Sequence, residues 1–310
     1  MVFWTTGCSG DHSKGTPAGL SATDPPTISD AGTIVDPGSP GIFGVGYVEV
    51  PALRPEVQIA AWYPTDVTHA GSAMPKTPGV RTGPLPVVLL APGDAGSGKS
   101  FTYLAEHLAS WGYVVVSGTT TDSKTAGAGL RFEEMWKGLS TSNNATAQLL
   151  GASLRTTKIA LIAASSAAAA PFDQAGGLDT AAIVVLGAHP AEIVSATSSR
   201  IPAMIMWSGT DGDPTVVRRL FANADPDVHP YIVHFPDGVQ DSFVDACQVD
   251  CPRVFTQQRA HELITRYVTA FLQTYVRGDL RYVRDLSASS TEPAEDEDDR
   301  PDVIVTRIGR

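Results

Sequence analysis

The chain has 310 residues, 43% of them apolar, which is enough for one large α/β domain or two small ones. The formal net charge is −11, and the carboxylate-rich stretch from Glu292 to Asp299 supplies part of it, so the remainder is only mildly acidic. The sequence has no basic stripe that would suit nucleic acid, which excludes a nucleic-acid partner. It also has no apolar run long enough to span a bilayer, which excludes a transmembrane helix.

The N-terminal segment, residues 1–42, is predicted to be a flexible tether. From residue 9 onward it is rich in Gly, Pro, Ser, Thr and Asp and lacks a periodic apolar pattern. Cys8 lies in Thr5-Thr6-Gly7-Cys8, which resembles the end of a bacterial lipoprotein signal. Seven preceding residues are too few for such a signal, so Cys8 is a candidate lipid anchor only if translation starts further upstream. A tether of this kind suits a protein that is secreted or anchored to the cell envelope.

Strands and helices are then predicted to alternate along the chain. An antiparallel pair comes first, at residues 46–50 and 57–63. Further strands are predicted at residues 85–91, 113–117, 182–186, 203–207 and 231–235, with one more leading into Ser165, and helices at residues 101–111, 145–153, 214–222 and 253–276. This order predicts an α/β fold: a mostly parallel twisted sheet with antiparallel N-terminal strands and helices on both faces. The domain is expected to cover residues 43–286. Residues 287–310 are expected to form an acidic disordered tail, in which residues 303–305 could dock as an edge strand.

The strand before Ser165 leads into an Ala-rich run that is typical of a helix. A serine at a sharp turn between a strand and a helix is the geometry of a nucleophile elbow, which raises the hydroxyl above the sheet. The usual pattern is G-x-S-x-G, and here the segment reads Ala163-Ala164-Ser165-Ser166-Ala167. The serine is present and both glycines are replaced. A buried strand followed by an Ala-rich helix without catalytic function is the alternative interpretation.

The loop after the strand at 85–91 contains a second motif. Gly93 to Ser100 matches the P-loop pattern G-x-x-x-x-G-K-[ST]. In a nucleotide-binding protein its backbone amides would hold phosphates, Lys99 would reach the terminal phosphate and Ser100 would bind Mg²⁺. The context argues against this function, because no neighbouring buried strand ends in the expected Mg²⁺-binding carboxylate. Nucleotide binding is therefore kept as a further alternative.

Two later loops could complete a catalytic triad. Asp211 follows the strand at 203–207, and the loop at 236–243 follows the last strand. The order serine, acid, then a loop after the final strand is the chain order of the α/β-hydrolase triad. The alternative role for this acidic segment is capping of the helix that begins at Pro214, which suits Asp213 better than Asp211.

From about Val45 to Leu286 the chain resembles the secreted cutinase and polyester (PET) hydrolase branch of the α/β-hydrolases, and more broadly dienelactone-hydrolase relatives. The family elbow "RLAVMGHSMGGGG" corresponds to residues 158–170, its acid segment "PTLIIGADLD" to residues 202–211, and its "LASHGF" to residues 108–113. The resemblance implies an α/β-hydrolase fold acting on a small ester or polymer-like ligand without a cofactor. It assigns Ser165 as nucleophile and Asp211 as triad acid, and places His189 at the border of the substrate cleft.

The departures from the family pattern concern the active site. The general-base histidine should follow Gly-Ala-x, but here Gly238-Val239-Gln240 is followed by Asp241. Asp94 stands where an aromatic residue lends its amide to the oxyanion hole, so Asp94 and Ser166 are the candidate residues of that hole. A carboxylate with a pKa near 4 is a poor base toward a serine hydroxyl.

Three hypotheses follow. The chain is an α/β-hydrolase-fold protein with an impaired active site, or an active serine esterase that uses a displaced base such as His189, or a nucleotide-binding protein. The spacing of Cys247 and Cys251 allows a disulfide. A metal site there is less favoured, because no further Cys or His lies beside them.

Overall fold

A computed structural model describes residues 34–52, 54, 57–68, 79–81, 83–93, 97–120, 131–154, 158–187, 200–209, 231–246, 256–287 and 304–307. Several predictions made from the sequence fall outside these ranges. They are the tether through residue 33, Cys8, Asp94, His189, Asp211, the helix at 214–222, Cys247, Cys251 and the acidic stretch 292–299.

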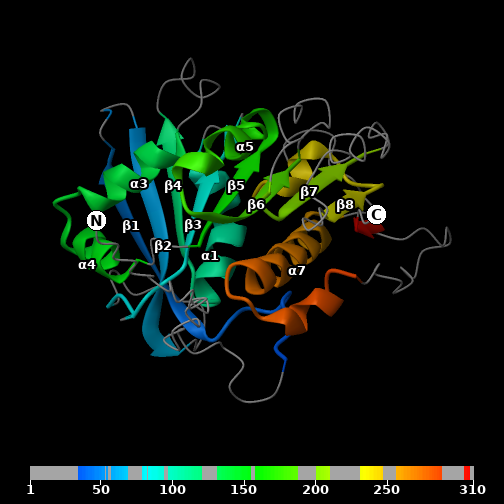
Figure 1. Ribbon diagram of the computed structural model, residues 1–310, viewed down its shortest axis with the longest axis horizontal. Coiled ribbons are helices and arrows are strands. Elements are labelled where there is room, and N and C mark those ends of the chain that lie inside the picture. The colour runs from blue at the N-terminus through cyan, green and yellow to red at the C-terminus, as the bar shows by residue number, and fades with distance from the viewer. Residues whose placement is uncertain are drawn as a thin grey trace, which may run out of the picture.

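The described strands form one mixed, mostly parallel sheet in the order β1-β2-β4-β3-β5-β6-β7-β8-β9 (Figure 1). The neighbouring pairs from β4 to β8 are parallel, whereas the pairs β1–β2, β2–β4 and β8–β9 are antiparallel. The strands are β1 (Phe43–Pro51), β2 (Val57–Thr68), β3 (Val87–Ala91), β4 (Val114–Thr120), β5 (Ile159–Ala164), β6 (Thr180–Leu186), β7 (Ala203–Ser208), β8 (Tyr231–Phe235) and β9 (Ile304–Arg307). The predicted α/β class and the antiparallel N-terminal pair are confirmed.

Helices cover both faces of the sheet because successive strand residues point to opposite sides. In β3, Val88 and Leu90 belong to the core beneath α1 (Thr102–Ser110) and α7 (Gln257–Tyr275). Val87 and Leu89 belong to the opposite core, which packs against α3 (Phe132–Ser140), α4 (Ala145–Ser153) and the short α5 (Ala170–Gln174). This two-sided burial explains why the central strands are continuous apolar runs.

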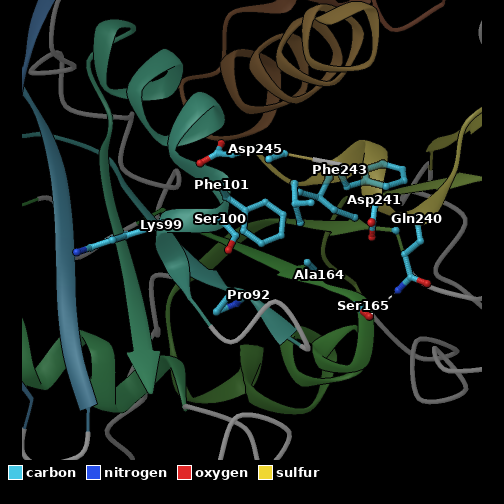
Figure 2. A pocket seen from close by; sticks show the side chains of 14 residues that line it. Pro92, Lys99, Ser100, Phe101, Ala164, Ser165, Gln240, Asp241, Phe243 and Asp245 are labelled. Atoms are coloured by element: carbon cyan, nitrogen blue, oxygen red, sulfur yellow. Dashed lines mark hydrogen bonds between the residues drawn. The ribbon is translucent and has the colours of Figure 1, made fainter. Parts of the chain in front are cut away.

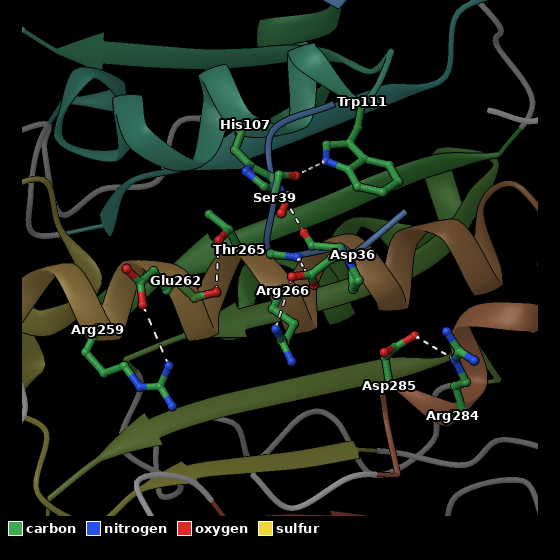
Figure 3. A network of polar contacts seen from close by, with 12 residues as sticks. Asp36, Ser39, His107, Trp111, Arg259, Glu262, Thr265, Arg266, Arg284 and Asp285 are labelled. Atoms are coloured by element: carbon green, nitrogen blue, oxygen red, sulfur yellow. Dashed lines mark hydrogen bonds and ion pairs between the residues drawn. The ribbon is translucent and has the colours of Figure 1, made fainter. Parts of the chain in front are cut away.

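The structured domain extends beyond residues 43–286 at both ends. At the C-terminal end, β9 pairs with β8, so the edge strand anticipated near residues 303–305 is present within the segment expected to be a disordered tail. At the N-terminal end, residues 36–41 pack against α1 and α7 (Figure 3). Trp111 Nε1 donates to the Ser39 carbonyl at 2.9 Å, and Arg266 pairs with Asp36 at 3.2 Å. Ordered residues are therefore found on both sides of the range 43–286.

Helix α3 was not predicted. Its buried residues Phe132, Met135 and Leu139 recur at i, i+3 and i+7, which is a helical signal. Within the described parts of the chain, no helix has both the length and the apolar character that a bilayer crossing requires.

Candidate active site

Ser165 lies at a sharp bend where the chain leaves the sheet. Strand β5 ends at Ala164 in extended conformation, and Ser165 has φ +48 before a 3₁₀ turn that leads toward α5. Apart from Lys158, Ser165 is the only non-glycine residue with positive φ in the described ranges. A left-handed conformation of this kind costs an L-residue about 1–2 kcal/mol. The sequence therefore holds a serine in a strained turn at the carboxyl end of a central parallel strand.

Gly93 provides the close approach beside this bend. It follows β3 with φ +59, and a Cβ at Gly93 would lie only 2.1 Å from the Ala164 carbonyl oxygen. The residues that replace the two elbow glycines of the family pattern fit the core instead. Ala163 is fully buried in the sheet, and Ala167 packs at the edge of the same core. The position that requires glycine is therefore Gly93, on the loop after β3, and not Ala163 or Ala167 in the elbow itself.

Gln240 faces Ser165 from the loop after β8. Its side-chain Nε2 donates to Ser165 Oγ at 2.7 Å, although the residues lie 75 positions apart in the chain (Figure 2). Gln240 opens the 3₁₀ turn Gln240–Phe243. The family pattern places the missing base at Asp241, but the side chain bonded to the serine is that of the preceding residue. Sequence reasoning did not single out Gln240.

A cavity of about 630 Å³ opens beside this contact, between β5 and the loop after β8. Its wall includes Ser165, Gln240 and Asp241 together with apolar side chains from several elements: Pro92, Phe101, Leu186, Phe243 and Val244. In Figure 2 the Asp241 carboxylate lies in the same space, between Phe243 and Ala164. Lys99, Ser100 and Asp245 line the cavity as well, so polar and apolar surface contribute about equally to the wall. The volume is in the range of small-molecule sites.

The loop after β8, which forms one wall of the cavity, is attached to α1 and packs on β8. Phe243 is buried against Phe235, with ring centroids 5.7 Å apart. Tyr103 Oη on α1 donates to the Phe243 carbonyl at 3.0 Å. Burial, and then the charge of Asp245, raise the pKa of Tyr103 well above its ordinary value, so the hydroxyl keeps its proton. The loop is thus held by the packing of Phe243 on Phe235 and by the hydrogen bond from Tyr103.

The three described histidines bond to carbonyl groups away from Ser165. His107 Nε2 contacts the Pro37 carbonyl at 2.9 Å, and His234 Nε2 contacts that of Gly209 at 2.8 Å. His261 Nε2 lies 2.8 Å from the Val244 carbonyl, and its ring stacks on Tyr103. None of these three supplies a base to the serine. His189, the displaced base considered above, lies outside the described residues, as do Asp211 and Asp94.

Lys99 of the P-loop-like segment and the first turn of the helix after it are engaged in contacts within the protein. The first two amides of α1, those of Thr102 and Tyr103, donate to the carboxylate of Asp245 at 3.1 and 3.0 Å. Lys99 Nζ pairs with Glu49 at 2.6 Å, and its ammonium lowers the pKa of that carboxyl. The Asp245 carboxylate therefore occupies the amides at this helix N-terminus. Lys99 lines the cavity, but its ammonium is bonded to Glu49 on β1 (Figure 2).

Among the residues that the structure describes, no three His, Cys, Asp or Glu side chains are grouped so that they could hold a metal ion. Ser166, the candidate oxyanion residue directly after Ser165, is exposed.

Comparison with protein-family models gives no match, and neither does comparison with curated proteins.

Proposed function

We propose that this chain is an α/β-hydrolase-fold protein related to cutinase-like carboxylic-ester hydrolases, with an impaired active site. It binds a small ester or polymer-like ligand in the cavity beside Ser165 and hydrolyses it feebly or not at all. The observation that carries this proposal is the 2.7 Å contact of Gln240 Nε2 with Ser165 Oγ.

The fold assignment is supported by the position of the serine. A buried parallel strand ends at Ala164, the next residue has positive φ, and a helical turn follows. This strand–turn–helix context is what a nucleophile elbow requires. Backbone strain at a residue that lines a cavity is also typical of functional sites.

The loss of activity is supported by the chemistry of Gln240. A carboxamide does not accept a proton at neutral pH, so it cannot act as the general base that a serine nucleophile needs. By donating a hydrogen bond to Oγ it orients the hydroxyl without activating it. Loss of a triad member typically lowers kcat by about 10⁴- to 10⁶-fold.

The test compares the wild-type protein with Ser165→Ala, using a fluorophosphonate probe and p-nitrophenyl butyrate. We expect little labelling and little turnover in the wild type. Rapid labelling of Ser165, with turnover that disappears in Ser165→Ala, would contradict the proposal and favour an active esterase with another base, such as His189. Binding is tested with ethyl butyrate by ligand-observed NMR. Leu186→Trp, which fills the cavity, should abolish the signal.

Nucleotide binding is tested separately by calorimetric titration with Mg-ATP. We expect a flat trace, because Asp245 occupies the amides of α1 and Glu49 holds Lys99. Heat that saturates and is lost in Lys99→Ala would revive the P-loop interpretation.

A further inference from the structure

The loop that carries Gln240 is held by α7. Gln257 Nε2, in the first turn of α7, donates to the carbonyl of Asp241 at 3.2 Å and also to the carbonyl of Val244. The first of these carbonyls belongs to the residue directly after Gln240. One side chain therefore bonds the carbonyl of the second residue of the turn that presents the amide to Ser165, and also the carbonyl of the residue just after that turn.

Other contacts fix the same loop at its far end. Asp245 caps α1, whose own N-cap residue, Phe101, makes no side-chain capping bond. The Asp245 amide donates in turn to the Ser100 carbonyl at 2.7 Å. The loop end is therefore anchored to α1 independently of Gln257, so loss of Gln257 should loosen the Gln240 turn without releasing the whole loop.

We propose that Gln257 is a positioning residue that sets Gln240 against Ser165. The inference rests on the proposed function, because it assigns the control of that site to α7. The exposed Gln240 side chain would otherwise sample several rotamers. The bonds from Gln257 to the carbonyls of Asp241 and Val244 fix the turn directly after Gln240, which restricts where the Gln240 amide reaches. The hydrogen bond from Gln240 to Ser165 then follows from the fixed conformation of the loop, and is not one of many conformations of a free surface side chain.

The test measures hydrogen exchange of the Gln240 side-chain amide by NMR, with its signals assigned by their loss in Gln240→Ala. In Gln257→Ala, where two hydrogen bonds to the loop are lost, exchange should become about tenfold faster. Gln257→Glu keeps the size of the side chain but removes its donors, and should give the same result. The matched control is Gln258→Ala, because the neighbouring Gln258 bonds Glu262 on the helix surface and should leave Gln240 unchanged.

The results separate this inference from the proposed function. Equal exchange of the Gln240 amide in the wild type and both Gln257 variants, with the fold intact by circular dichroism, would overturn the positioning role and leave the impaired site standing. Fast exchange already in the wild type would remove the Gln240–Ser165 contact itself, and with it both proposals. As an independent readout, Gln257→Ala added to Gln240→His should lower any esterase kcat gained by that variant about tenfold, with KM little changed.

Discussion

Gln240 Nε2 donates to Ser165 Oγ at 2.7 Å, and both residues line the cavity. In the proposed hydrolase site a general base would have to make this contact. We therefore expect Gln240→His to create esterase activity. An imidazole with a pKa near 6.5 can take the serine proton at neutral pH, whereas the carboxamide cannot. The rise in kcat/KM for p-nitrophenyl butyrate should be about 10- to 100-fold, below the full contribution of an optimised base.

Two further variants control this result. The gain must disappear in Ser165→Ala/Gln240→His, since the nucleophile is then absent. Asp241→His, the substitution that the family pattern would suggest, should give a smaller gain, because the side chain that reaches Ser165 is that of Gln240. A larger gain from Asp241→His would show that the loop does not present Gln240 to the serine in solution.

The strained bend predicts an unusual response to glycine. Ser165 has φ +48, so Ser165→Gly relieves strain that Ser165→Ala retains. We expect the glycine variant to be the more stable of the two by up to about 1 kcal/mol in urea unfolding. At the neighbouring Ser166, whose φ is not positive, the order should reverse, and glycine should be less stable than alanine by about 0.5–1 kcal/mol. The same order at both positions would mean that Ser165 is not strained.

Gly93 should tolerate no side chain. Gly93→Ala combines a left-handed conformation with a Cβ that would lie 2.1 Å from the Ala164 carbonyl oxygen. We expect a loss of about 2–4 kcal/mol in unfolding free energy, from strain and overpacking together. Gly278→Ala measures the strain alone, because φ there is +78 and nothing lies within 4 Å of the added Cβ. Similar losses at both positions would show that the loop moves away from the bend.

The central part of the sheet could be predicted closely from the sequence because strands such as β3 and β5 are buried on both faces. Helix Ala145–Ser153 and strand Tyr231–Phe235 have the same bounds in the structure as in the prediction. Such segments depend on local apolar pattern, which a single sequence contains. The bend at Ser165 was also predicted, from the abrupt change between a strand pattern and an Ala-rich helix pattern.

The contacts that define the candidate site could not be predicted in the same way. Asp245 caps a helix that begins 143 residues earlier in the chain, and no local pattern marks a cap supplied from such a distance. Gln240 was overlooked because the family pattern drew attention to the next position. Which of two adjacent loop side chains reaches Ser165 depends on the 3₁₀ turn that Gln240 opens, and thus on tertiary packing around Phe243.

His107 makes the stability of the N-terminal attachment dependent on pH. Burial is the main cause that lowers the pKa of His107 from 6.5 to about 4, although its bond to the Pro37 carbonyl and the charge of Asp36 act in the opposite direction. The unfolded imidazole then binds a proton at pH values where the folded one does not. The contribution of His107 to the unfolding free energy is therefore fully present above pH 6.5. It falls as the pH decreases toward 4, and this group causes no further loss below that value.

The prediction is tested with His107→Gln, whose amide can still donate to the Pro37 carbonyl but does not titrate. Between pH 7 and pH 5 the wild type should lose roughly 1–2 kcal/mol more unfolding free energy than the variant, measured by urea titration at each pH. Carboxylates titrate alike in both proteins, so the difference between the two curves isolates the histidine. Parallel curves would show that the imidazole is as accessible to protons in the folded protein as in the unfolded chain, and that residues 36–41 do not bury it in solution.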